Sequence, residues 1–290
     1  MVPGAASAQL AERHSFNVNG DVELIGNGLL TCSTSGAGGS DCASHRNGNG
    51  GNGNRNMVFI NVDPVGGSAP ANSSTATLDV PAGANVLSAG LYWAGRANNT
   101  SNARRNIWFK APGGGYERVT ALPQDLNTFN TQGDTYSNRP YTAYVDVTAR
   151  VRSAGSGSYS VGGLTAVTGN GLSLGNYGGW ALIVLYEDSS RPLRRLMVFD
   201  GDAGYVGSGN PASVTVSGLL TPPNGDFNAY MGALVWEGDA DISGDRFRLT
   251  GPGVLNGGDL SDAVSPANNF WNSRISRLGT EFTARNPNYP

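Results

Sequence analysis

The side chains best suited to chemistry lie in the stretch DADISGD, residues 239–245. Asp239, Asp241 and Ser243 stand at alternate positions, and Asp245 follows a glycine that suits a sharp turn. Hard cations such as Ca²⁺ take oxygen ligands from loops with this spacing. The glutamate that usually completes such a set is missing, because Thr250 occupies its place. The stretch predicts a structural Ca²⁺ site with ligands Asp239, Asp241, Ser243 and Asp245, and a metal-free Asp-rich turn is the alternative.

Residues for acid–base or nucleophilic catalysis are few. The two histidines are His14, near the start, and His45, inside a Gly/Asn/Ser-rich stretch expected to be a loop. Neither position is expected to hold an imidazole in the geometry that a general base needs. Glu187 and Glu237 each follow an apolar stretch and would suit glycoside hydrolysis if they met about 5–10 Å apart. Solvated strand ends are the simpler interpretation, so we expect no enzyme, with a glycoside hydrolase as the alternative.

Four tyrosines lie near glycine-rich turns, where an exposed aromatic ring would suit stacking on a sugar. They are Tyr116, Tyr136, Tyr177 and Tyr205. Cross-strand packing is the competing explanation for such residues. They are kept as candidate ligand-binding residues.

Two cysteines, Cys32 and Cys42, bracket a Gly/Ser-rich loop. Near the N-terminus, Ala6-Ser7-Ala8 has the small-x-small pattern of a signal-peptidase cleavage site. In an exported protein, two such cysteines are expected to form a disulfide. A zinc site that includes His45 is the alternative, but it lacks obvious third and fourth ligands.

Composition excludes several classes of protein. The 290 residues carry 19 basic and 22 acidic side chains, a net charge of −3, so the basic stripe of a nucleic-acid-binding protein is not expected. Glycine and proline together make up 58 residues, or 20%, which is below the roughly 25–30% typical of low-complexity disorder. No apolar run approaches the ~20 residues of a membrane-spanning helix. We therefore expect a folded chain with no membrane span.

Short apolar or alternating segments between Gly, Pro, Asn and Asp indicate strands. The predicted strands are 21–30, 56–62, 74–80, 85–94, 106–110, 141–145, 157–161, 180–187, 193–200, 212–216, 230–237 and 245–250. Segment 181–186 is continuously apolar, as in a central strand covered on both faces, and 196–199 and 234–236 are its expected neighbours. The pattern predicts an all-β antiparallel sandwich or jelly roll with long Gly/Asn-rich loops.

One helix is predicted, over 146–155, with Asp146 as N-cap and Gly155 as its stop. Segment 268–278 fits a helix and a strand about equally. Residues 1–15 are expected to be the remnant of an export signal with an N-terminal tail. Residues 16–290 are expected to form a single elaborated sandwich, and a division into two lobes near 162–179 is the alternative.

Several motifs resemble known families. The run YVDVTARV (144–151), followed by Gly155 and Tyr159, resembles the helix-and-strand element of galactose-binding-like jelly rolls, and LSAGLYWAG (87–95) supports the likeness. Four segments resemble the N-terminal ectodomain of large exported bacterial proteins that carry Ig-like "conserved repeat" modules. These are GDVELIGN (20–27), GWALIVLYED (179–188), FDG (199–201) and NNFWNS (268–273). The resemblance implies a surface or matrix protein and brings no catalytic residues with it.

Together these features predict a non-enzymatic, adhesin-like or fibre-forming module that is secreted to the bacterial cell surface or extracellular matrix. Its loops would bind a glycan or a protein, and an exposed sheet edge would let copies of the chain associate by strand addition. The alternative is a secreted carbohydrate-binding module or glycoside hydrolase on a jelly-roll scaffold.

Overall fold

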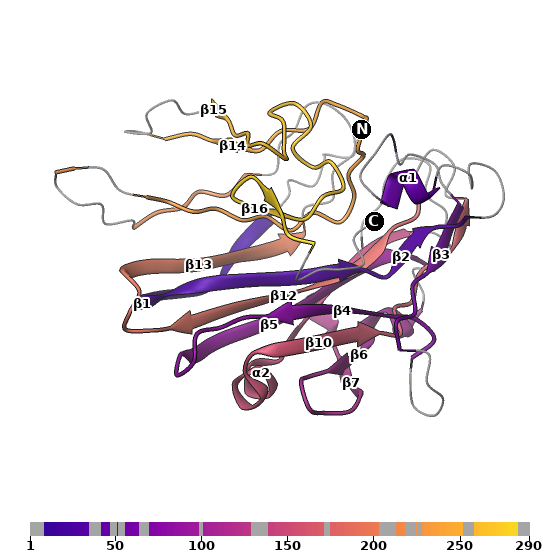
Figure 1. Ribbon diagram of the computed structural model, residues 1–290, viewed down its shortest axis with the longest axis horizontal. Helices are drawn as coiled ribbons and strands as arrows, with labels where there is room; N and C mark the ends of the chain where they lie inside the picture. The colour runs from indigo at the N-terminus through magenta and orange to yellow at the C-terminus, as the bar shows by residue number, and fades with distance from the viewer. Residues whose placement is uncertain are drawn as a thin grey trace, which may run out of the picture.

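The computed structural model describes residues 9–34, 42–46, 51, 56–63, 70–98, 101–128, 139–170, 175–202, 213–218, 224–225, 228–251 and 258–283. Within these ranges antiparallel strands dominate, and the predicted all-β class with one short helix is confirmed (Figure 1). That helix is α2 (Thr148–Ala154), and α1 (Cys42–Arg46) is a single further turn. No helix in the described ranges is long and apolar enough to cross a membrane.

The main sheet has six strands in the order β13-β1-β12-β5-β9-β8. Their bounds are β1 Gln9–Gly28, β5 Asn85–Ala97, β8 Leu126–Thr128, β9 Arg139–Asp146, β12 Gly178–Glu187 and β13 Leu193–Asp202. The end of β1, the start of β12 and the end of β5 meet at one end of this sheet, which we call the loop end. Glu187 and Asn85 pair at the opposite end, which we call the turn end.

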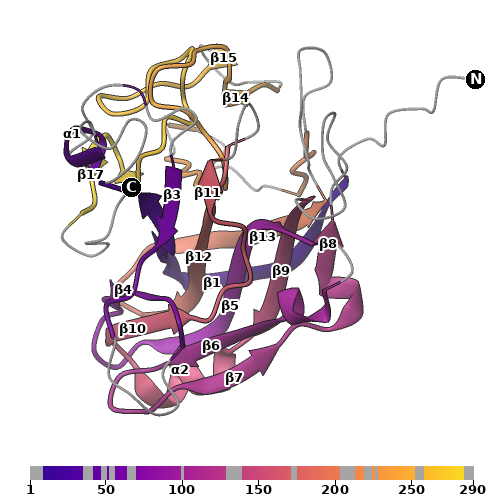
Figure 2. The ribbon, with the colours of Figure 1, turned by 90° about the vertical axis from the view of Figure 1, so that its right-hand side faces the viewer.

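A second sheet, β4-β10-β6-β7, packs on the inner face of the main sheet (Figure 2). Its strands are β4 Ser73–Leu78, β6 Asn106–Lys110, β7 Glu117–Thr120 and β10 Gly157–Gly162. The largest fully buried side chains of the shared core include Trp93 and Trp180. Their indole N–H groups donate to the Arg104 carbonyl and to Ser74 Oγ, each at 2.9 Å. The core is thus filled by large side chains whose polar atoms have partners.

The first strand belongs to two pairings. Its second half, from Gly20, pairs with β12, whereas its first half, up to Asn19, pairs with β13. A Cβ at Gly20 would lie 2.1 Å from the carbonyl oxygen of Tyr186, so only glycine fits where the two pairings meet. The strand begins at Gln9 and therefore includes part of the stretch 1–15 that sequence analysis placed in a tail.

The pair formed by β13 and the first half of β1 folds over the outer face of β12, β5 and β9. Leu196 and Val198 of β13 form a second apolar cluster with Leu185, and Ile183 packs against it. Both latter residues belong to β12, whose opposite face lies in the main core. The prediction of a central strand covered on both faces is confirmed. The hydrogen-bonded neighbours of β12 are β1 and β5, so the predicted neighbours 196–199 and 234–236 are wrong.

The predicted helix is confirmed, but its N-cap is Val147, so Asp146 lies one residue before the cap position predicted for it. Asp146 Oδ1 accepts a hydrogen bond from the Thr148 backbone N–H at 2.7 Å, which satisfies a donor of the first turn. Gly155 follows the last turn with φ 67°, a left-handed value that favours glycine. Val151 turns inward and joins the main core.

Smaller elements lie at the loop end and in the C-terminal part. A three-stranded sheet, β11-β3-β2, contains β2 Leu30–Cys32, β3 Asn56–Phe59 and β11 Gly169–Asn170. Two short hairpins follow, β14 Arg248–Leu249 with β15 Gly258–Asp259 and β16 Ser276–Arg277 with β17 Thr280–Glu281. One-turn 3₁₀ helices occupy η2 Asn102–Arg105 and η3 Pro123–Asp125.

Four segments considered in sequence analysis differ from the structure in the C-terminal part. The described residues of segments 212–216 and 230–237 form no strand, and Figure 1 draws them as thin tubes rather than arrows. Segment 245–250 pairs only at Arg248–Leu249, and 268–278 is mainly turns ending in β16. An alternating pattern gives a segment the capacity to form a strand, but a neighbouring strand must supply the hydrogen bonds.

Candidate functional site

The Asp-rich stretch 239–245 forms a loop that the segment 268–273 holds in place. The Gly244 N–H donates to the Asn268 carbonyl at 2.6 Å, and Asp245 Oδ1 accepts a hydrogen bond from the Trp271 backbone N–H at 2.9 Å. Three rings pack beside it with centroids 4.9 to 5.3 Å apart, those of Phe247, Phe270 and Trp271. The motif NNFWNS therefore serves as a brace for this loop.

Four carboxylates come together around this loop, and we call Glu237, Asp239, Asp241 and Asp245 the acidic cluster. Burial raises the pKa of Asp239, and the negative charges of Asp241 and Asp245 raise it further. Burial, with the charges of Asp239 and Asp245, also raises the pKa of Glu237, while nearby Arg96 acts in the opposite direction. Ionising the whole cluster is therefore unfavourable, and a bound cation would relieve the repulsion.

The predicted Ca²⁺ ligands Asp239, Asp241, Ser243 and Asp245 all lie in the described part of the chain. There, no three His, Cys, Asp or Glu side chains come together as a metal-binding group. Asp245 also uses one oxygen to accept the Trp271 N–H. The carboxylates are near enough to repel one another, but binding Ca²⁺ would require them to turn toward a common point. The Ca²⁺ site stays a prediction.

The predicted disulfide between Cys32 and Cys42 is confirmed, with Cα atoms 5.6 Å apart. The bond joins the end of β2 to the start of α1, and Arg46 at the end of α1 donates to the Cys32 carbonyl at 2.7 Å. Because both sulfurs are consumed by the disulfide, the alternative of a zinc site is wrong. The disulfide fixes α1 at the loop end of the main sheet.

The disulfide-linked loop and the acidic cluster lie at the same end of the molecule. A Cβ at Gly51, which follows α1, would lie 1.9 Å from the Asp241 carboxylate, so these two segments touch. Arg96 is the penultimate residue of β5, at the loop end. The loop end therefore combines a charged loop with a covalently fixed helical turn.

The two glutamates considered for glycoside hydrolysis lie at opposite ends of the main sheet. Glu187 pairs with Asn85 at the start of β5, whereas Glu237 lies near Arg96 at its other end. The eleven residue steps between Asn85 and Arg96 span about 35 Å of extended strand. A pair of catalytic carboxylates must lie within about 10 Å of each other. Glu187 and Glu237 therefore do not form such a pair.

The two candidate sugar-stacking tyrosines that the structure describes, Tyr116 and Tyr177, lie next to different strands. Tyr136 and Tyr205 lie outside the described residues. Tyr116 precedes β7, and the Lys110 ammonium lies 5.3 Å from its ring centroid. Tyr177 precedes β12 at the loop end. Only Tyr177 is thus placed near the acidic end of the sandwich.

The histidines lie on separate elements, His14 in β1 and His45 in α1. His45 is buried rather than part of a loop, and neither of its ring nitrogens has a hydrogen-bond partner. To act as a general base, an imidazole must point a proton-accepting nitrogen at the substrate. This packing suits a structural role for His45.

Sequence reasoning missed a charged cluster beneath the strand pair that covers the main sheet. Arg13 of β1 donates to Asp200 of β13 and, at 3.0 Å, to Asp125 of η3. Its guanidinium carbon lies 3.8 Å from the ring centroid of Tyr144, and the Tyr92 hydroxyl donates to Asp200 at 2.7 Å. We call these five residues the arginine cluster. Their separation along the chain leaves no local motif, so only the fold brings them together.

Electrostatics favour the ionised form of this cluster. Burial opposes the charge on Arg13, but the hydrogen bonds and negative charge of its carboxylate partners prevail and raise its pKa. Burial raises the pKa of Tyr144 to about 12, against the effect of Arg13. Burial and Asp200 together raise the pKa of Tyr92. Arg13 therefore stays charged and both tyrosines stay neutral over the whole physiological range.

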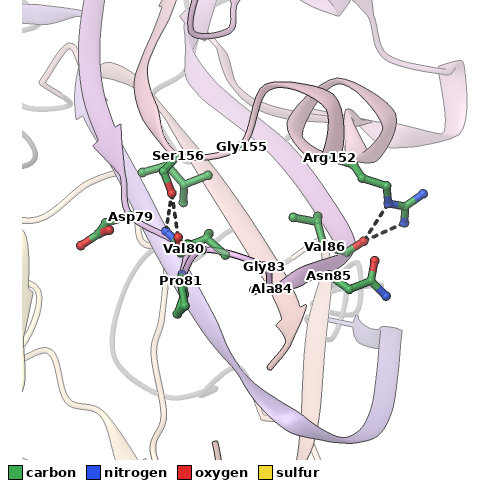
Figure 3. A pocket seen from close by; sticks show the side chains of 12 residues that line it. Asp79, Val80, Pro81, Gly83, Ala84, Asn85, Val86, Arg152, Gly155 and Ser156 are labelled. Atoms are coloured by element: carbon green, nitrogen blue, oxygen red, sulfur yellow. Dashed lines mark hydrogen bonds between the residues drawn. The ribbon is translucent and has the colours of Figure 1, made fainter. Parts of the chain in front are cut away.

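A surface depression of about 470 Å³ lies at the turn end, between the β4–β5 connection and α2 (Figure 3). Ser156 Oγ accepts from the Val80 N–H at 2.9 Å and donates to the Val80 carbonyl at 2.8 Å. Arg152 donates twice to the Val86 carbonyl, at 2.7 and 3.0 Å. These polar groups attach α2 to the connecting turn, so they explain the depression as a structural junction.

Comparisons of the chain with protein families, with curated proteins and with solved structures found no match. The resemblance to exported bacterial ectodomains and to galactose-binding-like jelly rolls therefore stays a prediction. The site is interpreted from its own geometry.

Proposed function

We propose that the chain is a non-catalytic recognition module of a bacterial protein exported to the cell surface or matrix. It binds a glycan or a protein through the loop end. The observation that carries the proposal is the coincidence of the acidic cluster with the disulfide-linked α1, joined where Gly51 touches Asp241. Disulfides of this kind persist in oxidising compartments, which supports export.

The acidic cluster favours binding over a purely structural role. Asp239 and Glu237 carry raised pKa values because like charges are held together with partial burial. A fold gains no stability from such repulsion, whereas ligand binding repays it when the ligand brings a cation or donates hydrogen bonds to the carboxylates. Because large side chains fill the core, a ligand would bind at the surface, and the loops at the loop end would contact it.

Binding by the loop end can be tested with a glycan microarray and with immobilised extracellular-matrix proteins, using the purified chain as probe. We expect Asp241→Asn to weaken the strongest interaction about tenfold or more, because it removes a charged contact. Glu187→Gln makes a matched change of charge at the turn end and is expected to bind like the wild type. Equal binding by both variants, or no ligand on either surface, contradicts the proposal.

An assay for hydrolysis on the same glycans addresses the alternative function. We expect the bound glycan to be recovered intact after long incubation. Release of shortened sugars that Glu237→Gln abolishes would instead assign the acidic cluster to a glycoside hydrolase, in which a carboxyl group with a raised pKa acts as general acid.

A further inference from the structure

The segment 228–237 is an apolar stretch that pairs with no strand among the described residues, and it bends at Trp236. Among the described residues, no backbone hydrogen bond joins it to another part of the chain. Tyr230, Met231 and Val235 are 58%, 45% and 45% exposed. Unpaired backbone groups and exposed apolar side chains on one segment make a template for an added strand. We call residues 228–237 the open segment.

The composition of the open segment favours a partner of the same kind. Its sequence is NAYMGALVWE, so its only charged side chain is Glu237 at one end. An acidic or basic peptide is normally recognised by complementary charges, and this segment has almost none to offer. Aromatic, β-branched and small residues without proline are instead typical of strands that pair with copies of themselves.

Symmetry restricts how two copies of the open segment pair. Two antiparallel strands related by a two-fold axis place each residue opposite one on the same face of the sheet, so the paired residue numbers differ by an even number. Centring the axis on Ala233 places Tyr230 opposite Trp236 and Met231 opposite Val235. Aromatic and large apolar cross-strand pairs of this kind stabilise sheets. Glu237 then faces Ala229, so no like charges oppose each other.

Centring the axis on Gly232 gives a poorer match. Trp236 would then face Asn228, and Met231 would face Ala233. Tyr230 would still face Leu234, but Trp236 and Met231 would lose their large apolar partners, which reduces the apolar area removed from water. The register centred on Ala233 is therefore the better of the two.

We propose that the chain forms a symmetric dimer in which two open segments pair antiparallel about Ala233. The partner is a second copy of this chain, and Glu237 at the end of the open segment is also a member of the acidic cluster. Ala233 is itself exposed, so substitutions there leave the core untouched. At the two-fold axis each residue faces its own copy, which makes the proposal testable with a single position.

The test is sedimentation velocity and native mass spectrometry of the purified chain. We expect the wild type to dimerise, and Ala233→Lys and Ala233→Glu each to raise the dissociation constant about tenfold or more, because like charges then meet at the axis. Mixing the two variants is expected to restore a dimer through a Lys–Glu pair. Leu278→Lys, at a residue 75% exposed elsewhere, controls for added charge and is expected to leave the dimer intact.

A cross-linking experiment tests the register separately. Residues opposite each other on antiparallel strands have Cα atoms about 4.5–5.5 Å apart, within the range of a disulfide. Ala233→Cys is therefore expected to give a covalent dimer under mild oxidation, and Leu278→Cys is not. A wild type that stays monomeric at every concentration tested, or a dimer indifferent to charge at Ala233, would overturn the proposal.

Discussion

Replacing Arg13 with methionine tests whether the arginine cluster holds the covering strand pair on the main sheet. Methionine keeps much of the apolar stem of arginine but removes the charge and all donors. Asp125 and Asp200 then lose the cation that both of them contact. We expect the covering strands to loosen first, because their remaining contacts with β12 are the small cluster around Leu185.

The expected loss follows from how far the cluster is removed from water. The side chain of Arg13 is 28% exposed, and those of Asp125 and Asp200 are 13% and 18% exposed. Fully exposed ion pairs contribute about 0–1 kcal/mol, whereas removing one member of a buried pair costs about 3–5 kcal/mol. Discounted for this residual exposure, Arg13→Met should lower the free energy of unfolding by about 2–3 kcal/mol. At about 2 °C per kcal/mol for a chain of this size, Tm should fall by about 4–6 °C.

Urea denaturation and calorimetry measure this loss, and Arg150→Met provides the matched control. Arg150 pairs with Glu117 on the surface, where the two side chains are 42% and 66% exposed. We expect that control to change stability by less than about 0.5 kcal/mol. Tyr92→Phe removes one hydrogen bond to Asp200 and should cost about 1 kcal/mol. If Arg13→Met is no more destabilising than Arg150→Met, the cluster has no structural role and the reasoning fails.

Other parts of the structure give four further predictions. Changing Cys32 and Cys42 together to serine should cost about 2.7 kcal/mol by loop entropy, or about 5 °C in Tm by calorimetry, and an unchanged melting temperature would contradict it. Asp239→Asn should stabilise the chain at pH 7 and reduce its gain in stability on acidification, because a raised pKa means the folded state binds more protons and loses stability as pH rises through the mildly acidic range. The same denaturation series with Ca²⁺ or EDTA tests the metal prediction: Ca²⁺ should raise the Tm of the wild type but not of this variant, and no response in either retires the site. Gly90→Ala should cost about 1–3 kcal/mol in urea denaturation, because a Cβ there would lie 2.8 Å from the Tyr144 ring; a neutral result would mean the rings shift freely.

Local patterns predicted the elements whose cause is local. The continuous apolar run 181–186 identified a strand covered on both faces, and Gly155 marked the end of α2, whose first residue, Thr148, lies two positions after Asp146. Cys32 and Cys42 sit close in sequence on either side of a short loop, so their pairing required little knowledge of the fold. In each case a few neighbouring residues contain all the information.

Strand order and long-range contacts had no comparable signal. The hydrogen bond between Arg13 and Asp200 joins residues 187 positions apart, and no periodicity links them. The proximity of Glu187 and Glu237 was a hypothesis about strand ends, but Glu187 lies beside the start of β5 and Glu237 near its other end. Segment 230–237 has the pattern of a strand and yet lacks a partner in the described chain. A sequence pattern indicates which face of a strand is apolar and leaves its neighbours open.

The two ends of the main sheet differ in a way that bears on function. At the turn end, polar side chains such as Ser156 and Arg152 form hydrogen bonds with backbone atoms and hold them in place. At the loop end, Asp239, Asp241 and Asp245 are braced close together although their charges repel. The brace around Trp271 therefore works against electrostatics at a point where simple separation of the loop would relieve it. Groups with perturbed pKa values cluster at functional sites, so the raised pKa of Asp239 supports the proposal that this loop binds a ligand.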